Sequence, residues 1–152
     1  MRYLIVLSSF LIACNWGSDP SLSLAEDVVE FINKGKTDLI ERSLMSEEQS
    51  RRIMKYDENI ITAKLSEQMR KDLLKNIYDS VEKFRKENKI ASPSNFKIKS
   101  VEFIHESVSL GKLFIEIYNS DFEGTVQFSV AKDDGTLYLI SPMKIAKTEK
   151  SK

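Results

Sequence analysis

The hydrophobic period of this chain changes near its middle, and that change constrains the fold more than any other feature. Upstream of residues 91–95, apolar residues recur every three or four positions, which is typical of amphipathic helices. Downstream they alternate with other residues, which is typical of strands. Pro93 lies between the two halves; it lacks an amide hydrogen and disfavours helix at Ser92. The sequence therefore predicts an α+β fold, with helices first and strands second.

Three shorter helical segments are predicted before the longest one. The first begins at Ser23, because Ser23 and Glu26 have the spacing of a capping box, and it ends at Gly35. A short helix follows from Thr37. A second capping-box match, Ser46–Gln49, opens the third segment.

The longest predicted helix covers residues 63–88. Residues 57–63, just before it, fit either a loop or a short strand. The apolar stripe of the predicted helix consists of Leu65, Met69, Leu73, Ile77, Val81 and Phe84. A basic cluster near its end suits the negative end of the helix dipole. We interpret the cluster as a solvated helix face, with an anion-binding or membrane-surface helix as the alternative; it consists of Lys83, Arg85, Lys86 and Lys89.

Four strands are predicted after the break. Their alternating residues fall in four stretches, at 96–103, 113–118, 126–130 and 137–145. The alternation slips by one residue at Lys99-Ser100, which indicates a β-bulge. The segment Lys132–Gly135 fits a hairpin turn, and Pro142 either places the last strand at an edge or breaks it. Such short connections predict a four-stranded antiparallel meander with the N-terminal helices packed on it.

Three aromatic residues fall on the strand face that a one-sided helix layer would leave open: Phe114, Tyr118 and Tyr138. Either the sheet curls into a cone that partly covers both faces, or these residues form a candidate binding surface. A long helix followed by a curled meander is similar to the cystatin-like and nuclear-transport-factor-like architecture. This resemblance is topological, covers residues 23–146 and carries no residue motif, so it implies no functional residue.

The first fourteen residues have the order of a secretory signal. Arg2 precedes an apolar run over residues 3–12, and the small residue Ala13 precedes Cys14, which is the only cysteine. The run is half the length of a membrane-spanning helix, which needs about 20 apolar residues. The ending Leu11-Ile12-Ala13-Cys14 resembles the lipobox of bacterial lipoproteins. The resemblance implies cleavage before Cys14 and lipidation of its thiol; an ordinary cleaved signal would leave the cysteine unexplained.

This interpretation divides the chain into four parts. Residues 1–13 are a cleaved signal peptide, 14–22 the lipidated cysteine and its tether, 23–146 one α+β domain, and 147–152 a disordered tail. The tether reaches at most about 25–30 Å, so the domain is expected close to the bilayer. In lipoproteins the residue after the cysteine influences sorting. Asn15 is not the aspartate associated with inner-membrane retention, which favours the outer membrane.

No residue pattern indicates catalysis, a cofactor or a metal. His105 is the only histidine, and acylation of Cys14 leaves no free thiol, which argues against His/Cys zinc clusters. No phosphate-binding glycine motif occurs, and a hairpin explains Asp133-Asp134. Lys+Arg and Asp+Glu both number 23, a balance that gives no reason to expect nucleic acid as a partner.

These observations favour a membrane-anchored lipoprotein that acts as a non-catalytic binding module in the bacterial cell envelope. Its expected partners are the lipid bilayer, through acylated Cys14, and an envelope protein or small ligand that the sequence does not identify. One alternative is an inhibitor or immunity-type protein directed against an envelope-active toxin or enzyme. A second is a small carboxylate-dependent enzyme housed in the curled sheet.

Overall fold

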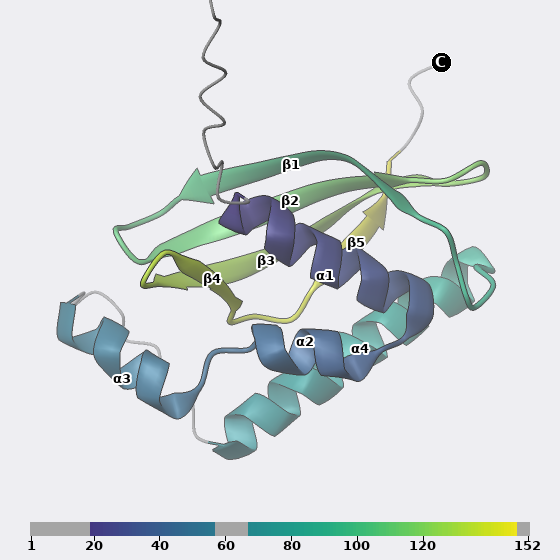
Figure 1. The fold of residues 1–152 in the computed structure, drawn as a ribbon. Helices are drawn as coiled ribbons and strands as arrows, with labels where there is room; N and C mark the ends of the chain where they lie inside the picture. The colour runs from purple at the N-terminus through teal and green to yellow at the C-terminus, as the bar shows by residue number, and fades with distance from the viewer. Residues whose placement is uncertain (1–18, 57–66, 149–152) are drawn as a thin grey trace, which may run out of the picture.

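The computed structural model describes residues 19–56 and 67–148. Its helices precede its strands, so the predicted α+β class is confirmed (Figure 1). The predicted signal peptide, Cys14, residues 57–63 and the first residues of the predicted long helix lie outside the described residues. The elements are α1 (Pro20–Lys34), α2 (Thr37–Ser43), α3 (Glu47–Tyr56), α4 (Glu67–Asn88), β1 (Lys97–His105), β2 (Leu110–Tyr118), β3 (Glu123–Asp133), β4 (Thr136–Leu139) and β5 (Lys144–Lys147).

The strands form one open antiparallel sheet in the order β1-β2-β3-β4, and β5 also pairs with β3. The fourth predicted strand is therefore two strands, which lie one after the other along the same edge of β3. The break falls at Pro142, which cannot donate a ladder hydrogen bond. Beside it, the Ser129 amide donates to Oγ of Ser141 at 2.8 Å, so a side-chain oxygen takes the place of a strand carbonyl as its acceptor. Lys147, assigned from sequence to the disordered tail, ends β5.

Two local predictions within the sheet are confirmed. The register of β1 against β2 shifts between Ile98 and Ser100, so Lys99 is the extra residue of a bulge. The β3–β4 hairpin turns through Asp134 and Gly135, with φ of 48° and 77°. Both are left-handed, as a two-residue hairpin that matches the twist of its strands requires.

The helix ends are set by capping. The predicted capping box is present: the Ser46 amide donates to Oε1 of Gln49 at 2.7 Å, and the Gln49 amide donates to Oγ of Ser46 at 3.2 Å. Gly35 ends α1 in the left-handed conformation, as predicted, with φ of 69°. The predicted start at Ser23 is wrong. Asp19 caps α1 instead, and proline is favourable at the first helical position.

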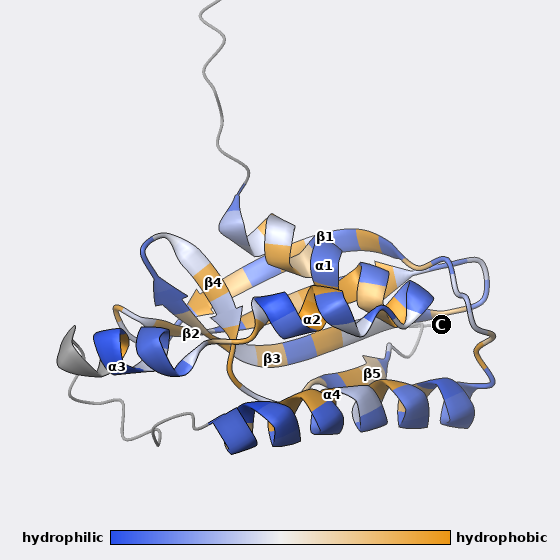
Figure 2. Ribbon diagram, turned by 60° about the horizontal axis from the view of Figure 1, so that its bottom comes forward, coloured by the Kyte–Doolittle hydropathy of each residue, from blue (hydrophilic) through white to orange (hydrophobic). Residues whose placement is uncertain are grey.

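The core lies between one sheet face, called here the inner face, and helices α1 and α4. The polar residues of α4 face away from the sheet (Figure 2). Fully buried side chains come from α1, α2, α4 and strands β2, β3 and β4, among them Val28, Phe31, Ile77, Ile115, Val126, Phe128 and Leu139. The inner face is therefore filled by hydrophobic side chains.

Two contacts hold α1 and α4 against the start of β1. The Asn33 side chain accepts from the Phe96 amide at 2.7 Å and donates to the Phe96 carbonyl at 2.9 Å, as a neighbouring strand would. Phe96 also lies with Phe84 of α4 and Phe122 of the β2–β3 turn, at ring-centroid distances of 5.2 to 6.3 Å. These contacts place the C-terminal ends of α1 and α4 beside each other.

Candidate functional site

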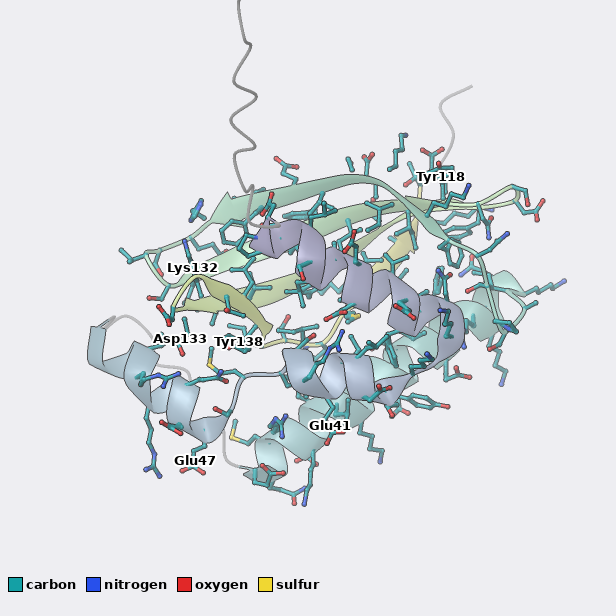
Figure 3. The ribbon with its side chains drawn as sticks, in the orientation of Figure 1. Glu41, Glu47, Tyr118, Lys132, Asp133 and Tyr138 are labelled. Atoms are coloured by element: carbon teal, nitrogen blue, oxygen red, sulfur yellow. The ribbon has the colours of Figure 1, made fainter. Side chains whose placement is uncertain are left out.

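The three predicted aromatic residues lie on the same face of the sheet, called here the outer face, opposite the α1–α4 core. Phe114 pairs with Glu102 of β1 and Gln127 of β3, whereas its neighbour Ile115 points into the core. Figure 3 shows that Tyr118 and Tyr138 nevertheless lie at opposite ends of the sheet. The three side chains therefore do not converge on one point.

Helix α3 covers the end of the outer face where Tyr138 lies. Tyr138 is half-buried there in a small second cluster, which also contains Met45, Ile53, Leu110, Ala131 and Ile140. Arg52 of α3 donates to Asp133 of β3 at 2.6 Å, which ties the helix to the strand and raises the pKa of Arg52. Tyr138 thus contributes to the attachment of α3, and the candidate surface narrows to the part around Phe114 and Tyr118.

The remaining outer face combines apolar side chains with a charge cluster. Phe114 is half-buried, while Ile104 and Tyr118 are 44% and 40% exposed. Beside Tyr118, Lys99 of the bulge pairs with Glu123 and lies 3.9 Å from Glu116. The hydrogen bond to Glu123 raises the pKa of Lys99. Exposed apolar groups next to a charged cluster are typical of a protein-binding surface.

The sequence analysis considered His105, Asp133 and Asp134 for catalysis or metal binding and rejected them. In the structure each makes a side-chain contact or occupies a turn. The His105 ring packs edge-on against Phe103 at 4.4 Å. Asp133 holds Arg52, and Asp134 occupies the hairpin turn. Within residues 19–56 and 67–148, no three His, Cys, Asp or Glu side chains gather as a metal site would require.

A second candidate region, a cleft, was not predicted from the sequence. It is a cleft of about 800 Å³ between the C-terminal ends of α1 and α4, called here the basic cleft. Tyr78 and Ile90 form apolar parts of its wall, and Glu82 is its carboxylate. Its cationic lining consists of Lys34, Lys83, Arg85, Lys86 and Lys89.

Arg85 forms the floor between the two helices. It is 7% exposed and donates through one guanidinium nitrogen to the Ile32 carbonyl near the end of α1. Its other terminal nitrogen donates to Glu82 at 3.2 Å and to Oγ of Ser92 at 3.3 Å. Among the described atoms, its buried Nε has no hydrogen-bond partner. Arg85 therefore fixes one positive charge at the base of the cleft.

The cationic residues of α4 were visible in the sequence as a cluster, but the cleft was not. Its opposite wall is the end of α1, which the Asn33–Phe96 and Arg85–Ile32 contacts place there. Those contacts span more than fifty positions in the chain, and helix periodicity carries no information about them. The capped end of α1 at Gly35 was the one local signal for this wall.

No family model, no curated protein and no solved structure matches this chain. In the described part of the chain, no helix combines the length and apolar character needed to cross a bilayer.

Proposed function

We propose that the protein is a bacterial lipoprotein that is anchored through acylated Cys14 and acts as a non-catalytic binding module in the cell envelope. The observation that carries this proposal is the lipobox-like Leu11-Ile12-Ala13-Cys14 at the end of a signal-like segment. Because α1 begins at Pro20, only residues 15–19 separate the cysteine from the fold. Fully extended, they reach at most about 18 Å, so the domain stays close to the bilayer.

The open part of the outer face is the region that would bind a partner protein. It presents Ile104, Phe114 and Tyr118, next to the charges of Lys99 and Glu116. The inner face is filled by the core and contributes only stability. We place the anchored protein at the outer membrane, because Asn15 follows the cysteine.

Lipidation is tested with the Cys14→Ala chain. We expect it to lose labelling by a fatty-acid analogue and to accumulate as the unprocessed precursor. Trp16→Phe, which changes a residue two positions away, should be labelled and processed like the wild type. Labelling of Cys14→Ala at the wild-type level would refute the anchor.

The binding face is tested by placing a photo-crosslinking amino acid at Ile104, at Phe114 or at the exposed Lys71 of α4. We expect a discrete crosslinked complex in intact cells from the two outer-face positions and none from position 71. A complex whose formation is blocked by Phe114→Lys would identify the surface. Absence of a complex at positions 104 and 114, or equal products from all three positions, would argue against this face.

A further inference from the structure

We propose that the basic cleft binds a small ligand that carries two or more phosphate groups. Five cationic side chains line it against one carboxylate. Glu30 and Glu87 pair with two of these cations from outside the cleft, and the ends of α1 and α4 contribute about half a negative charge each. Even with all these charges counted, the cleft remains positive. When a ligand displaces Glu30 and Glu87 from their lysines, the positive charge of the cleft rises to about +3. A phosphate group carries about −1.5 to −2 charges at neutral pH, so two of them complement that charge.

Two of the lysines are available for a ligand. Within the described residues, neither Lys86 nor Lys89 has a carboxylate within 4.0 Å, and both are exposed at the rim. Lys34 lies 2.8 Å from Glu30, and Lys83 lies 3.8 Å from Glu87. Exposed pairs of this kind contribute little to stability, so a phosphate group can replace the carboxylate partner. Arg85, already fixed at the floor, supplies a guanidinium that needs no reordering.

The backbone at Lys89 provides an independent argument. Lys89 has a φ of 54°, and the Ile90 amide donates to the Arg85 carbonyl at 2.9 Å, so α4 ends in a Schellman motif. Glycine is the favoured residue at that position, and α1 uses Gly35 at its own end. A lysine in the left-handed conformation is strained by its Cβ atom, and a glycine at this position would not carry that strain. Lysine at this position is explained if its charge serves a ligand in the cleft.

The shape and position of the cleft favour a small molecule over a membrane surface. Its volume of about 800 Å³ is within the range of ligand pockets. It lies at the C-terminal end of α1, whereas the tether joins the opposite end, about 22 Å away along the helix. The expected lipid anchor is therefore attached far from the cleft. The proposal does not depend on that anchor.

The test is calorimetric titration of the full chain, in an uncharged detergent at physiological ionic strength, with inorganic pyrophosphate as the probe. We expect the double variant Lys86→Gln/Lys89→Gln to weaken binding by at least about tenfold, because it removes the two uncommitted charges. The matched control Lys71→Gln/Lys75→Gln makes the same charge change on exposed residues of the same helix, outside the cleft. It should alter the affinity by less than about twofold.

Lys89→Gly separates binding from folding. Removal of the strain should raise the melting temperature by about 2–5 °C, while pyrophosphate affinity falls. A residue with only a structural role would not produce opposite changes. Cys14→Ala should bind pyrophosphate like the wild type, which separates this proposal from lipidation. No pyrophosphate binding, equal loss in both double variants, or binding only to vesicles of anionic phospholipid would each overturn it.

Discussion

The two faces of the sheet differ at neighbouring residues of one strand. Ile115 lies between Val101 and Val126 and is fully buried beneath the helices, whereas Phe114 lies between Glu102 and Gln127 and is only half-buried. Both side chains are large and apolar, so composition alone does not separate them. The helix layer does, because α1 and α4 cover the inner face, whereas among the described helices only α3 lies on the outer face, at one end. The inner face therefore provides stability, and the outer face is available for binding.

The largest expected effect is the difference in unfolding free energy between Ile115→Ala and Phe114→Ala. Ile115→Ala leaves a cavity in a closed core and should lower the free energy of unfolding by about 2–5 kcal/mol. Phe114→Ala removes a ring that is only partly buried and should cost about 1 kcal/mol, less than Ile115→Ala. Urea unfolding followed by far-ultraviolet circular dichroism measures both. Equal costs at positions 114 and 115 would mean that the outer face is also part of the core.

A smaller effect is expected where α3 meets the outer face. Ile53 is 4% exposed in the second cluster, which is much smaller than the main core. Ile53→Ala should cost about 2 kcal/mol, the lower end of the range for such substitutions, because the site can collapse. The loss should be local, so hydrogen exchange should accelerate in α3 and around Tyr138 and stay unchanged in the centre of β2.

The exposed Arg51→Ala, on the same helix, provides the control, because its pair with Glu47 lies within α3 itself. It should leave exchange around Tyr138 unchanged. If both variants accelerate exchange there equally, then helix stability, and not the hydrophobic contact, holds α3 in place.

The sequence predicted the features that depend on neighbouring residues. The change of period predicted the fold class, the slip at Lys99-Ser100 predicted the bulge, and Ser46–Gln49 predicted a helix start. The start of α1 was mispredicted because two caps were available, and Asp19 with Pro20 was the better one. In each case the deciding sequence signal lies within a few positions along the chain.

The features that were missed depend on contacts between distant segments. Alternation shows that Tyr138 points away from the core, but not that α3 covers it. In the same way, the four cations at the end of α4 predict a charged helix end, but not a cleft. The cleft forms because the end of α1 lies beside them. The candidate site therefore required the tertiary arrangement, although its residues were visible in the sequence.

The smallest effect concerns charges rather than burial. Glu30 accepts from Nζ of Lys34 at 2.8 Å, and this hydrogen bond lowers the pKa of Glu30 below its usual value of 4.5. A lowered pKa means that the pair stabilises the fold when pH exceeds the usual value, and that this contribution is lost as pH falls through the lowered pKa. Because both groups are exposed, the contribution should be well below those of Ile115 and Ile53.

Glu30→Gln should therefore reduce the urea midpoint slightly at neutral pH. The difference from the wild type should disappear as pH falls through the lowered pKa of Glu30, because protonated Glu30 is uncharged, like glutamine. The same substitution frees Lys34 at the edge of the basic cleft, so pyrophosphate should bind more tightly to the variant at neutral pH. A variant with lower stability and higher affinity would show that Glu30 competes with the ligand for Lys34. A fall in both quantities would instead mean that the Glu30–Lys34 pair holds the end of α1 in the position that forms the cleft.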